Sequence, residues 1–223
     1  MTIPLSAPDI TEEEIAAVTA VLRTPRLSMG PELAAFESAL ARYHSVADAV
    51  AVSSGTAALH LALVTLGVGP GHEVILPSFA FIAVANAVYL AGATAVFAEI
   101  DPATLNLVPD SVERGITPRT RAILVVHTFG VPADLEALRS IADRHGIPMI
   151  EDACEAIGAQ FDGRRVGGFG DLAVLGFYPN KQITTGEGGR DTGSRPRTGG
   201  AASAAAQSGP GPGSRARERA FQR

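Results

Sequence analysis

The chain has 223 residues, with 18 basic and 23 acidic side chains, and 46% of its residues are hydrophobic. That hydrophobic fraction excludes a chain disordered throughout, and the net charge of −5 argues against a general nucleic-acid binder. The single cysteine, Cys154, excludes an internal disulfide and a cysteine-rich zinc site. We find no signal-peptide pattern at the start and no apolar stretch long enough to span a bilayer, so we expect a soluble cytoplasmic protein that binds neither nucleic acid nor membrane.

The composition changes abruptly at residue 190. Residues 1–189 hold 11 basic and 21 acidic side chains, whereas residues 190–223 hold seven arginines and two acidic residues. The second segment is rich in glycine and alanine and has no Ile, Leu, Val or Met. Such a segment cannot bury enough apolar surface to offset its chain entropy. We therefore expect one folded unit at 1–189 and a disordered Gly/Ala/Arg-rich tail at 190–223.

Hydrophobic periodicity divides the folded unit into helices and strands. Thr11 and Glu14 form a capping-box pattern before a first helix, and Pro31 suits the first turn of a second one. From residue 49 onward, short apolar strands alternate with helical segments, which predicts an α/β three-layer sandwich with a mostly parallel sheet. The predicted strands are 49–52, 74–76, 95–97, 122–126, 148–150 and 172–175, the later helices are 56–66, 79–90 and 134–145, and a hairpin turn is predicted at 160–164.

Polar groups follow several of the predicted strand ends, where sheets of this kind bind ligands. In Ser53-Ser54-Gly55-Thr56-Ala57 a glycine lies between a strand and a helix. There a phosphate can approach the first free amides of the helix. The alternative is a plain N-cap in which Ser54 or Thr56 holds the first turn.

Asp152 follows another buried strand, where a carboxylate needs a partner because burial disfavours its charge. A protonated pyridine nitrogen would be such a partner, and the alternative is a carboxylate that caps the next helix. Lys181 is the only lysine in an arginine-rich chain. This choice indicates an amine that can lose its proton and attack a carbonyl, which a guanidinium cannot do. The alternative is a surface lysine without a role.

The segments around these residues contain a phosphate cradle, an aromatic platform, a strand-end carboxylate and a loop lysine. Pyridoxal 5′-phosphate (PLP) needs all four, as phosphate anchor, stacking surface, counter-ion for the ring nitrogen and point of covalent attachment. His127 follows a strand as well, but a structural histidine is the favoured interpretation. The histidines show no metal-ligand spacing, so we expect no metal site.

Residues 1 to about 189 resemble the DegT/DnrJ/EryC1/StrS sugar aminotransferases, which have the fold-type I architecture of PLP-dependent transferases. The last segment that carries the resemblance is highly specific, whereas the first is weak alone. These segments are Ser54-Gly55-Thr56-Ala57-Ala58-Leu59, Pro77-Ser78-Phe79-Ala80-Phe81 with Asn86, Glu151-Asp152-Ala153-Cys154-Glu155-Ala156, and Gly176-Phe177-Tyr178-Pro179-Asn180-Lys181 through Thr184-Thr185-Gly186-Glu187-Gly188-Gly189.

The resemblance implies roles for single residues. Lys181 would be the catalytic lysine that attaches PLP, Asp152 the partner of the ring nitrogen, and Phe81 the residue stacked on the ring. Gly176 stands where many members have a phosphate-binding serine, so that contact is absent or made by backbone. Dehydratase relatives replace the lysine with histidine, so Lys181 favours transamination. The implied cofactor-binding residues are Ser54, Gly55, Thr56, Phe81, Asp152, Glu155 and Lys181.

The family also implies a reaction. An amino group, by analogy from glutamate, would be transferred to a nucleotide-linked keto sugar in polysaccharide or secondary-metabolite biosynthesis, by a homodimer. The alternatives are an inactive truncated remnant of such an enzyme and another PLP enzyme of the same fold. Relatives continue beyond Gly189 with more large-domain structure, so residues 1–189 would be the N-terminal part of an incomplete large domain. We hypothesise that a frameshift or a truncated reading frame just after the lysine loop produced the tail, and expect the product to fold poorly or aggregate and to show little activity.

Overall fold

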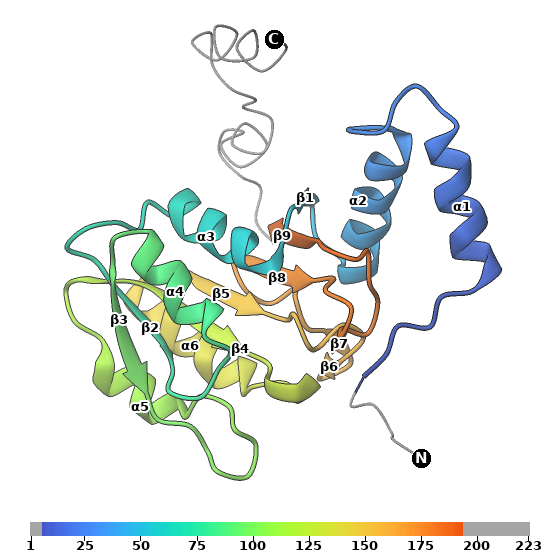
Figure 1. Ribbon diagram of the computed structural model, residues 1–223. Coiled ribbons are helices and arrows are strands. Elements are labelled where there is room, and N and C mark those ends of the chain that lie inside the picture. Colours follow the sequence, from blue (N-terminus) through green and yellow to red (C-terminus); the bar gives the residue numbers. More distant parts are fainter. Residues whose placement is uncertain (1–5, 194–223) are drawn as a thin grey trace, which may run out of the picture.

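The computed structural model describes residues 6–193 (Figure 1). The two N-terminal helices are followed by alternating strands and helices, as the sequence predicts. In chain order the elements are α1 (Glu12–Leu22), α2 (Pro31–His44), β1 (Asp48–Val52), α3 (Gly55–Thr65), β2 (Glu73–Pro77), α4 (Ala83–Leu90), β3 (Thr94–Ala98), α5 (Pro109–Gly115), β4 (Thr120–Val126), the 3₁₀ helix η1 (Thr128–Gly130), α6 (Leu135–His145), β5 (Met149–Asp152), β6 (Gln160–Phe161), β7 (Arg164–Arg165), β8 (Leu172–Gly176) and β9 (Gly189–Gly193).

Seven strands form one mixed sheet in the order β1-β9-β8-β5-β4-β2-β3. The pairings from β3 through β2, β4 and β5 to β8 are all parallel. Only β9 runs antiparallel, to both β1 and β8. The other six strands therefore point the same way, and their carboxyl ends meet at one edge of the sheet. The predicted hairpin is the separate pair β6-β7.

Helices cover both faces of this sheet and separate two hydrophobic cores (Figure 1). On one face α3 and α4 pack on strand residues such as Leu124, Ile150 and Val174. On the other face α2, α5 and α6 pack on residues that alternate with these, such as Ile123 and Met149. Strands buried on both faces explain why the sequence shows continuous apolar runs there, and the predicted three-layer arrangement is confirmed.

Local signals begin and end several helices as predicted. The Thr11 hydroxyl accepts the amide of Glu13, and the Thr11 amide donates to Glu14 Oε2 at 2.7 Å, which completes the capping box of α1. In α6, Asp134 caps the first turn and Gly146 ends the helix with φ of 63°. The helix predicted over 79–90 begins only at Ala83, because residues 79–82 cross from β2 to α4. In the described range 6–193, no helix is both long and apolar enough to cross a membrane.

The end of the folded unit differs from the expected boundary. Arg190, the first residue of the expected tail, lies in β9, which fills the gap between β1 and β8. Strand β9 pairs with β1 on one side and with β8 on the other. Main-chain hydrogen bonds hold a strand whatever its side chains are, so a composition argument does not detect it. Residues 194–223, where we predicted disorder, lie outside the described residues.

Candidate active site

Three segments of the predicted site converge at the carboxyl edge of the sheet. Strand β1 leads into the start of α3, β5 ends at Asp152, and β8 ends at Gly176. The chain then forms the loop that carries Lys181 and returns to the same edge, because Gly189 of β9 pairs with Gly176. Segments that are more than 100 residues apart in the sequence are thereby placed around one point.

The start of α3 shows both features that we considered for it. Ser54 is the N-cap, and its hydroxyl accepts the amide of Ala57 at 3.1 Å. The amides of Gly55 and Thr56 come before the first possible intrahelical bond, so the helix itself leaves them without an acceptor. Ser54 therefore has the plain capping role, while the two amides at the positive end of the helix stay suited to an anion.

Close packing around Cys154 explains two glycines of the site. A Cβ atom added to Gly55 would lie 3.0 Å from Cys154 Sγ, and one added to Gly176 would lie 3.1 Å from the same sulfur. Glycine at both positions lets the start of α3, the end of β8 and the segment after Asp152 approach one another. A serine side chain at position 176 would compete with the Cys154 sulfur for space, which accounts for the departure from the family pattern.

Asp152 is a buried carboxylate with few protein partners. Its Oδ1 accepts a hydrogen bond from the amide of Cys154 at 3.0 Å. Within residues 6–193, Cys154 is the residue that forms hydrogen bonds with the Asp152 carboxyl. Burial raises the pKa of Asp152, and the hydrogen bonds of Cys154 and the positive charge of Lys181 offset this only in part. The site thus presents a carboxyl group that a cationic partner would stabilise in its ionised form.

Lys181 lies in the loop between β8 and β9, with its side chain 18% exposed. Its Nζ donates to Glu155 Oε1 at 2.9 Å. The amine is close enough to act on the ionisation of both Asp152 and Cys154. Burial, the largest influence, raises the pKa of the Cys154 thiol well above its ordinary value, which disfavours the thiolate form.

The aromatic platform is less complete. Phe81 lies between β2 and α4 at the same edge of the sheet, but its side chain is 77% exposed. Its stacking role stays a prediction, because the chain itself does not fix the ring. Among residues 6–193, no group of three or more His, Cys, Asp or Glu side chains is placed to hold a metal ion.

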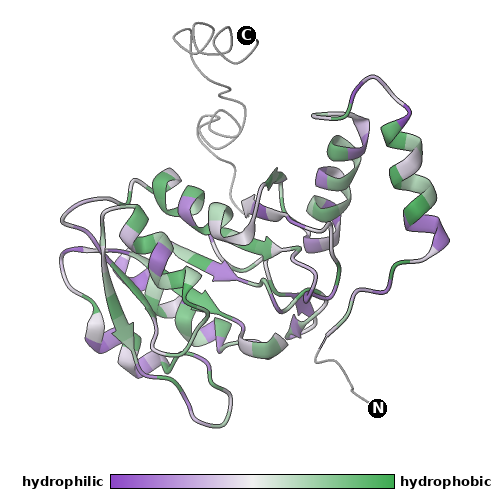
Figure 2. Cartoon of the chain, in the orientation of Figure 1, coloured by the Kyte–Doolittle hydropathy of each residue, from purple (hydrophilic) through white to green (hydrophobic). Residues whose placement is uncertain are grey.

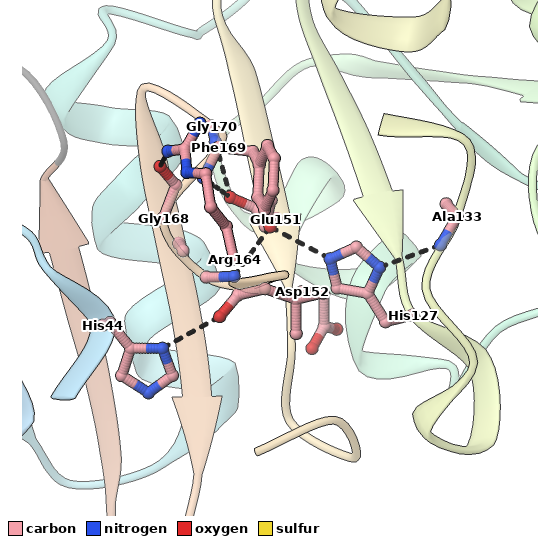
Figure 3. Close-up of polar contacts among 12 residues, drawn as sticks. His44, His127, Ala133, Glu151, Asp152, Arg164, Gly168, Phe169 and Gly170 are labelled. Carbon is pink, nitrogen blue, oxygen red and sulfur yellow. Dashed lines mark hydrogen bonds and ion pairs between the residues drawn. The ribbon is translucent and has the colours of Figure 1, made fainter. Parts of the chain in front are cut away.

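Glu151 and His127 form a buried, hydrogen-bonded pair beside Asp152 (Figure 3). Of these two residues, only His127 was considered for a role from the sequence. The amide of Ala133 donates to His127 Nδ1, so the proton of the neutral ring is on Nε2, which donates to Glu151 Oε2 at 3.1 Å. His127 has no exposed surface, which agrees with the structural role favoured for it. The sequence indicates a loop at the glycine-rich segment 167–170, but not that its amides donate to Glu151.

Burial alone would raise the pKa of Glu151. Hydrogen bonds from His127 and from the amides of Gly170 and Gly167 outweigh burial and hold the pKa below its ordinary value. Glu151 is therefore an ionised carboxylate with four hydrogen-bond donors, whereas its neighbour Asp152 accepts from Cys154. Since side chains alternate along a strand, the two carboxylates of β5 point to opposite faces of the sheet (Figure 3).

Comparison with known proteins places this site in a family. The pattern that defines the DegT/DnrJ/EryC1/StrS aminotransferase family matches residues 8–198, and the chain belongs to this family. It is 46% identical over 191 residues to the GDP-perosamine synthase of Caulobacter vibrioides, which covers 85% of this chain and 52% of that protein.

Solved structures of aminotransferases share the fold. S. venezuelae DesV, solved with a ketimine intermediate, is 47% identical with a TM-score of 0.79, over 83% of this chain and 50% of DesV. A Streptococcus pneumoniae protein solved in its PLP-form is 32% identical with a TM-score of 0.85, over 88% of this chain and 54% of that one. The chain thus has the architecture of PLP-dependent aminotransferases and spans about half the length of these relatives.

Proposed function

We propose that this chain belongs to a PLP-dependent aminotransferase that transfers an amino group, from glutamate, to a keto group on a nucleotide-linked sugar. The observation that carries the proposal is the convergence of Lys181, the buried Asp152 and the start of α3 at one edge of the sheet. Family membership supports the reaction type, and the relative named for a GDP-linked sugar supports the substrate class.

The residues present fit the cofactor. Asp152 offers a buried carboxyl whose pKa is raised by burial, so the protonated nitrogen of a pyridine ring would stabilise its ionised form. Glycines at 55 and 176 let the start of α3 and the end of β8 pack closely around the Cys154 sulfur. When bound, PLP supplies an aldehyde that reacts with amines and a ring that withdraws electrons from the bond being broken.

Each side chain then has a definite task. Asp152 would hold a proton on the ring nitrogen by stabilising its positive charge. The amides of Gly55 and Thr56 would bind the phosphate, and Phe81 would cover the ring. The Lys181 amine would attach the cofactor covalently. Once the amino donor has displaced it, the free amine would take the proton from the Cα atom of the donor and deliver it to the aldehyde carbon of the cofactor. Glu155, which now contacts Nζ, would hold this amine while it is free.

The proposal includes a homodimer and the cytoplasmic location that we expected from the sequence. The competing interpretation is an inactive remnant that retains part of the site. A third is another PLP enzyme of the same fold, which product analysis with keto sugars would distinguish from a sugar aminotransferase.

Covalent trapping tests the proposal. The chain is incubated with PLP, reduced with borohydride and digested, and the labelled peptide is identified by mass spectrometry. We expect a visible absorbance band, and a label on the peptide that contains Lys181, the only lysine. The Lys181→Arg variant keeps the positive charge but cannot attach the aldehyde, so it should lose the label.

Turnover supplies the second measurement. With glutamate and a nucleotide-linked keto sugar, the unsubstituted chain should form the amino sugar and Lys181→Ala should form none. Labelling confined to the terminal amine, or equal labelling of the Lys181→Arg variant, would show that the lysine assignment is wrong. Labelling at Lys181 without turnover would indicate the inactive remnant.

A further inference from the structure

Glu151 is the most fully hydrogen-bonded carboxylate near the site. It has no exposed surface and accepts four hydrogen bonds. His127 Nε2 donates to Oε2 at 3.1 Å, and the amide of Gly167 donates to the same oxygen at 2.7 Å. The amides of Phe169 and Gly170 both donate to Oε1. A buried carboxylate with this many donors is stable only while all of them stay in place.

The partners of Glu151 connect three strands at the edge that carries the site. The His127 amide, just after β4, donates to the carbonyl of Asp152 at 3.1 Å, so His127 holds β5 by its main chain and its ring. The Ala153 amide donates to the carbonyl of Val174 in β8 at 2.9 Å. The turn 167–170 leads directly into β8, whose end begins the loop of Lys181.

The chemistry of this position requires a carboxylate. All four neighbours are donors, and the proton of the His127 ring is fixed on Nε2 because Nδ1 accepts the Ala133 amide. Glutamine has nearly the same shape, but its NH₂ group would face either two amides or an amide and the imidazole N–H. The Glu151→Gln change therefore leaves buried donors without acceptors and pushes the turn away from β5.

We infer that Glu151, oriented by His127, is a positioning residue that fixes Asp152 relative to the lysine loop. It touches no reacting atom and acts through the end of β5 and the turn that precedes β8. The functional part of this inference rests on the proposed function, since Asp152 matters for catalysis only if the ring of PLP binds beside it. The structural part concerns the cofactor-free chain alone and is tested separately.

Amide hydrogen exchange of the cofactor-free chain tests the structural part. The amides of His127 and Cys154 bond to the main chain and side chain of Asp152, so they report how firmly it is held. Glu151→Gln should speed their exchange about tenfold relative to the Leu138 amide of α6, since local opening sets the rate. The control is Met149→Ala, which removes a buried side chain from the same face of β5 and should leave these ratios unchanged.

PLP titration tests the functional part. Following the absorbance change, we expect Glu151→Gln to raise the dissociation constant about tenfold, as is common when a residue that orients a ligand group is lost. If Glu151 acts through Asp152, the same substitution should have little further effect in an Asp152→Asn background. His127→Gln keeps a donor toward Glu151 and should give a smaller change in the same direction, which provides a milder variant if Glu151→Gln does not fold.

The outcomes separate the two proposals. Unchanged exchange at His127 and Cys154 in Glu151→Gln would overturn the positioning role whatever the cofactor does. Equal weakening of PLP binding with and without Asp152 would overturn the claim that Glu151 acts through Asp152. If the unsubstituted chain binds no PLP at all, the proposed function is wrong, while the exchange ratios still decide whether Glu151 holds Asp152.

Discussion

Asp152 and Glu151 are adjacent carboxylates whose surroundings give them opposite properties. Glu151 receives four hydrogen bonds and is stabilised in its ionised form, whereas Asp152 is buried with Cys154 as its neighbour. A buried acid whose pKa is raised by its surroundings lowers the stability of the folded chain, and functional sites commonly retain such a cost. This contrast supports the proposed role of Asp152 as the partner of a cationic ring nitrogen.

Replacing Asp152 by asparagine should stabilise the cofactor-free chain. Asparagine still accepts the Cys154 amide but carries no charge into the buried site, so the free energy of unfolding at pH 7 should rise by about 1 kcal/mol. The folded state raises the pKa of Asp152, so its penalty is complete above the folded pKa and disappears as the pH falls toward the unfolded value of about 3.9. The gain should therefore shrink between pH 7 and pH 4.

Urea unfolding at several pH values measures this gain. Asp48→Asn, at the exposed start of β1, is the matched control and should change stability little at any pH. A loss of stability in Asp152→Asn at pH 7 would show that the carboxylate has a cationic partner in the chain itself, and would weaken the case for a missing ligand.

At the scale of elements, β9 is a buried strand that carries charged side chains. It lies between β1 and β8, and its side chains are completely buried although they include Arg190 and Asp191. Within residues 6–193, Nε and Nη1 of Arg190 have no hydrogen-bond partner, and Nη2 donates to the carbonyl of Glu37 at 3.4 Å. Burial lowers the pKa of the Arg190 guanidinium to about 10, so it remains charged at neutral pH.

Substitution of Arg190 by methionine should stabilise the chain. Methionine fills a similar volume without buried N–H groups, and we expect the free energy of unfolding to rise by about 2 kcal/mol. Arg121→Met is the control, because Arg121 lies on β4 with its side chain exposed and should change stability by less than about 0.5 kcal/mol. Urea denaturation gives both values, and equal effects of the two substitutions would contradict the burial of Arg190.

At the scale of the whole molecule, the N-terminal helices project from one end of the sheet (Figure 1). Helix α1 has no buried residue, although several of its residues are hydrophobic and coloured green in Figure 2. Ile15, Val18 and Leu22 recur at helical spacing and are each about half exposed or more. A stripe of this kind on the surface favours association with other apolar surfaces.

We therefore expect the chain to self-associate as its concentration rises. The double variant Val18→Gln and Leu22→Gln removes the middle and end of the stripe and should reduce the mean sedimentation coefficient at high concentration. Glu13→Gln, on the exposed first turn of the same helix, should leave association unchanged. Sedimentation velocity at several concentrations measures the effect, and identical profiles for the unsubstituted chain and the double variant would exclude α1 as the contact.

Local sequence signals determined most of the elements and the candidate chemistry. The period of apolar residues predicted the alternating strands and helices, the capping box marked α1, and the sole lysine and the strand-end Asp152 indicated the cofactor. These features depend on neighbours within a few residues, so they can be read along the chain. The structure adds that Lys181 and Asp152 lie close enough for the amine to act on the carboxyl.

Only the tertiary structure decided which distant segments meet. Strand β9 exists because β1 and β8 leave room for one antiparallel strand, although the composition of residues 190–193 indicates a tail. The four donors of Glu151 come from His127, which follows β4, and from a turn 16 to 19 residues further along the chain. Cys154 fills the space between Gly55 and Gly176. Such contacts depend on how the sheet closes and on backbone groups that every residue carries, so no pattern of side chains along the sequence identifies them.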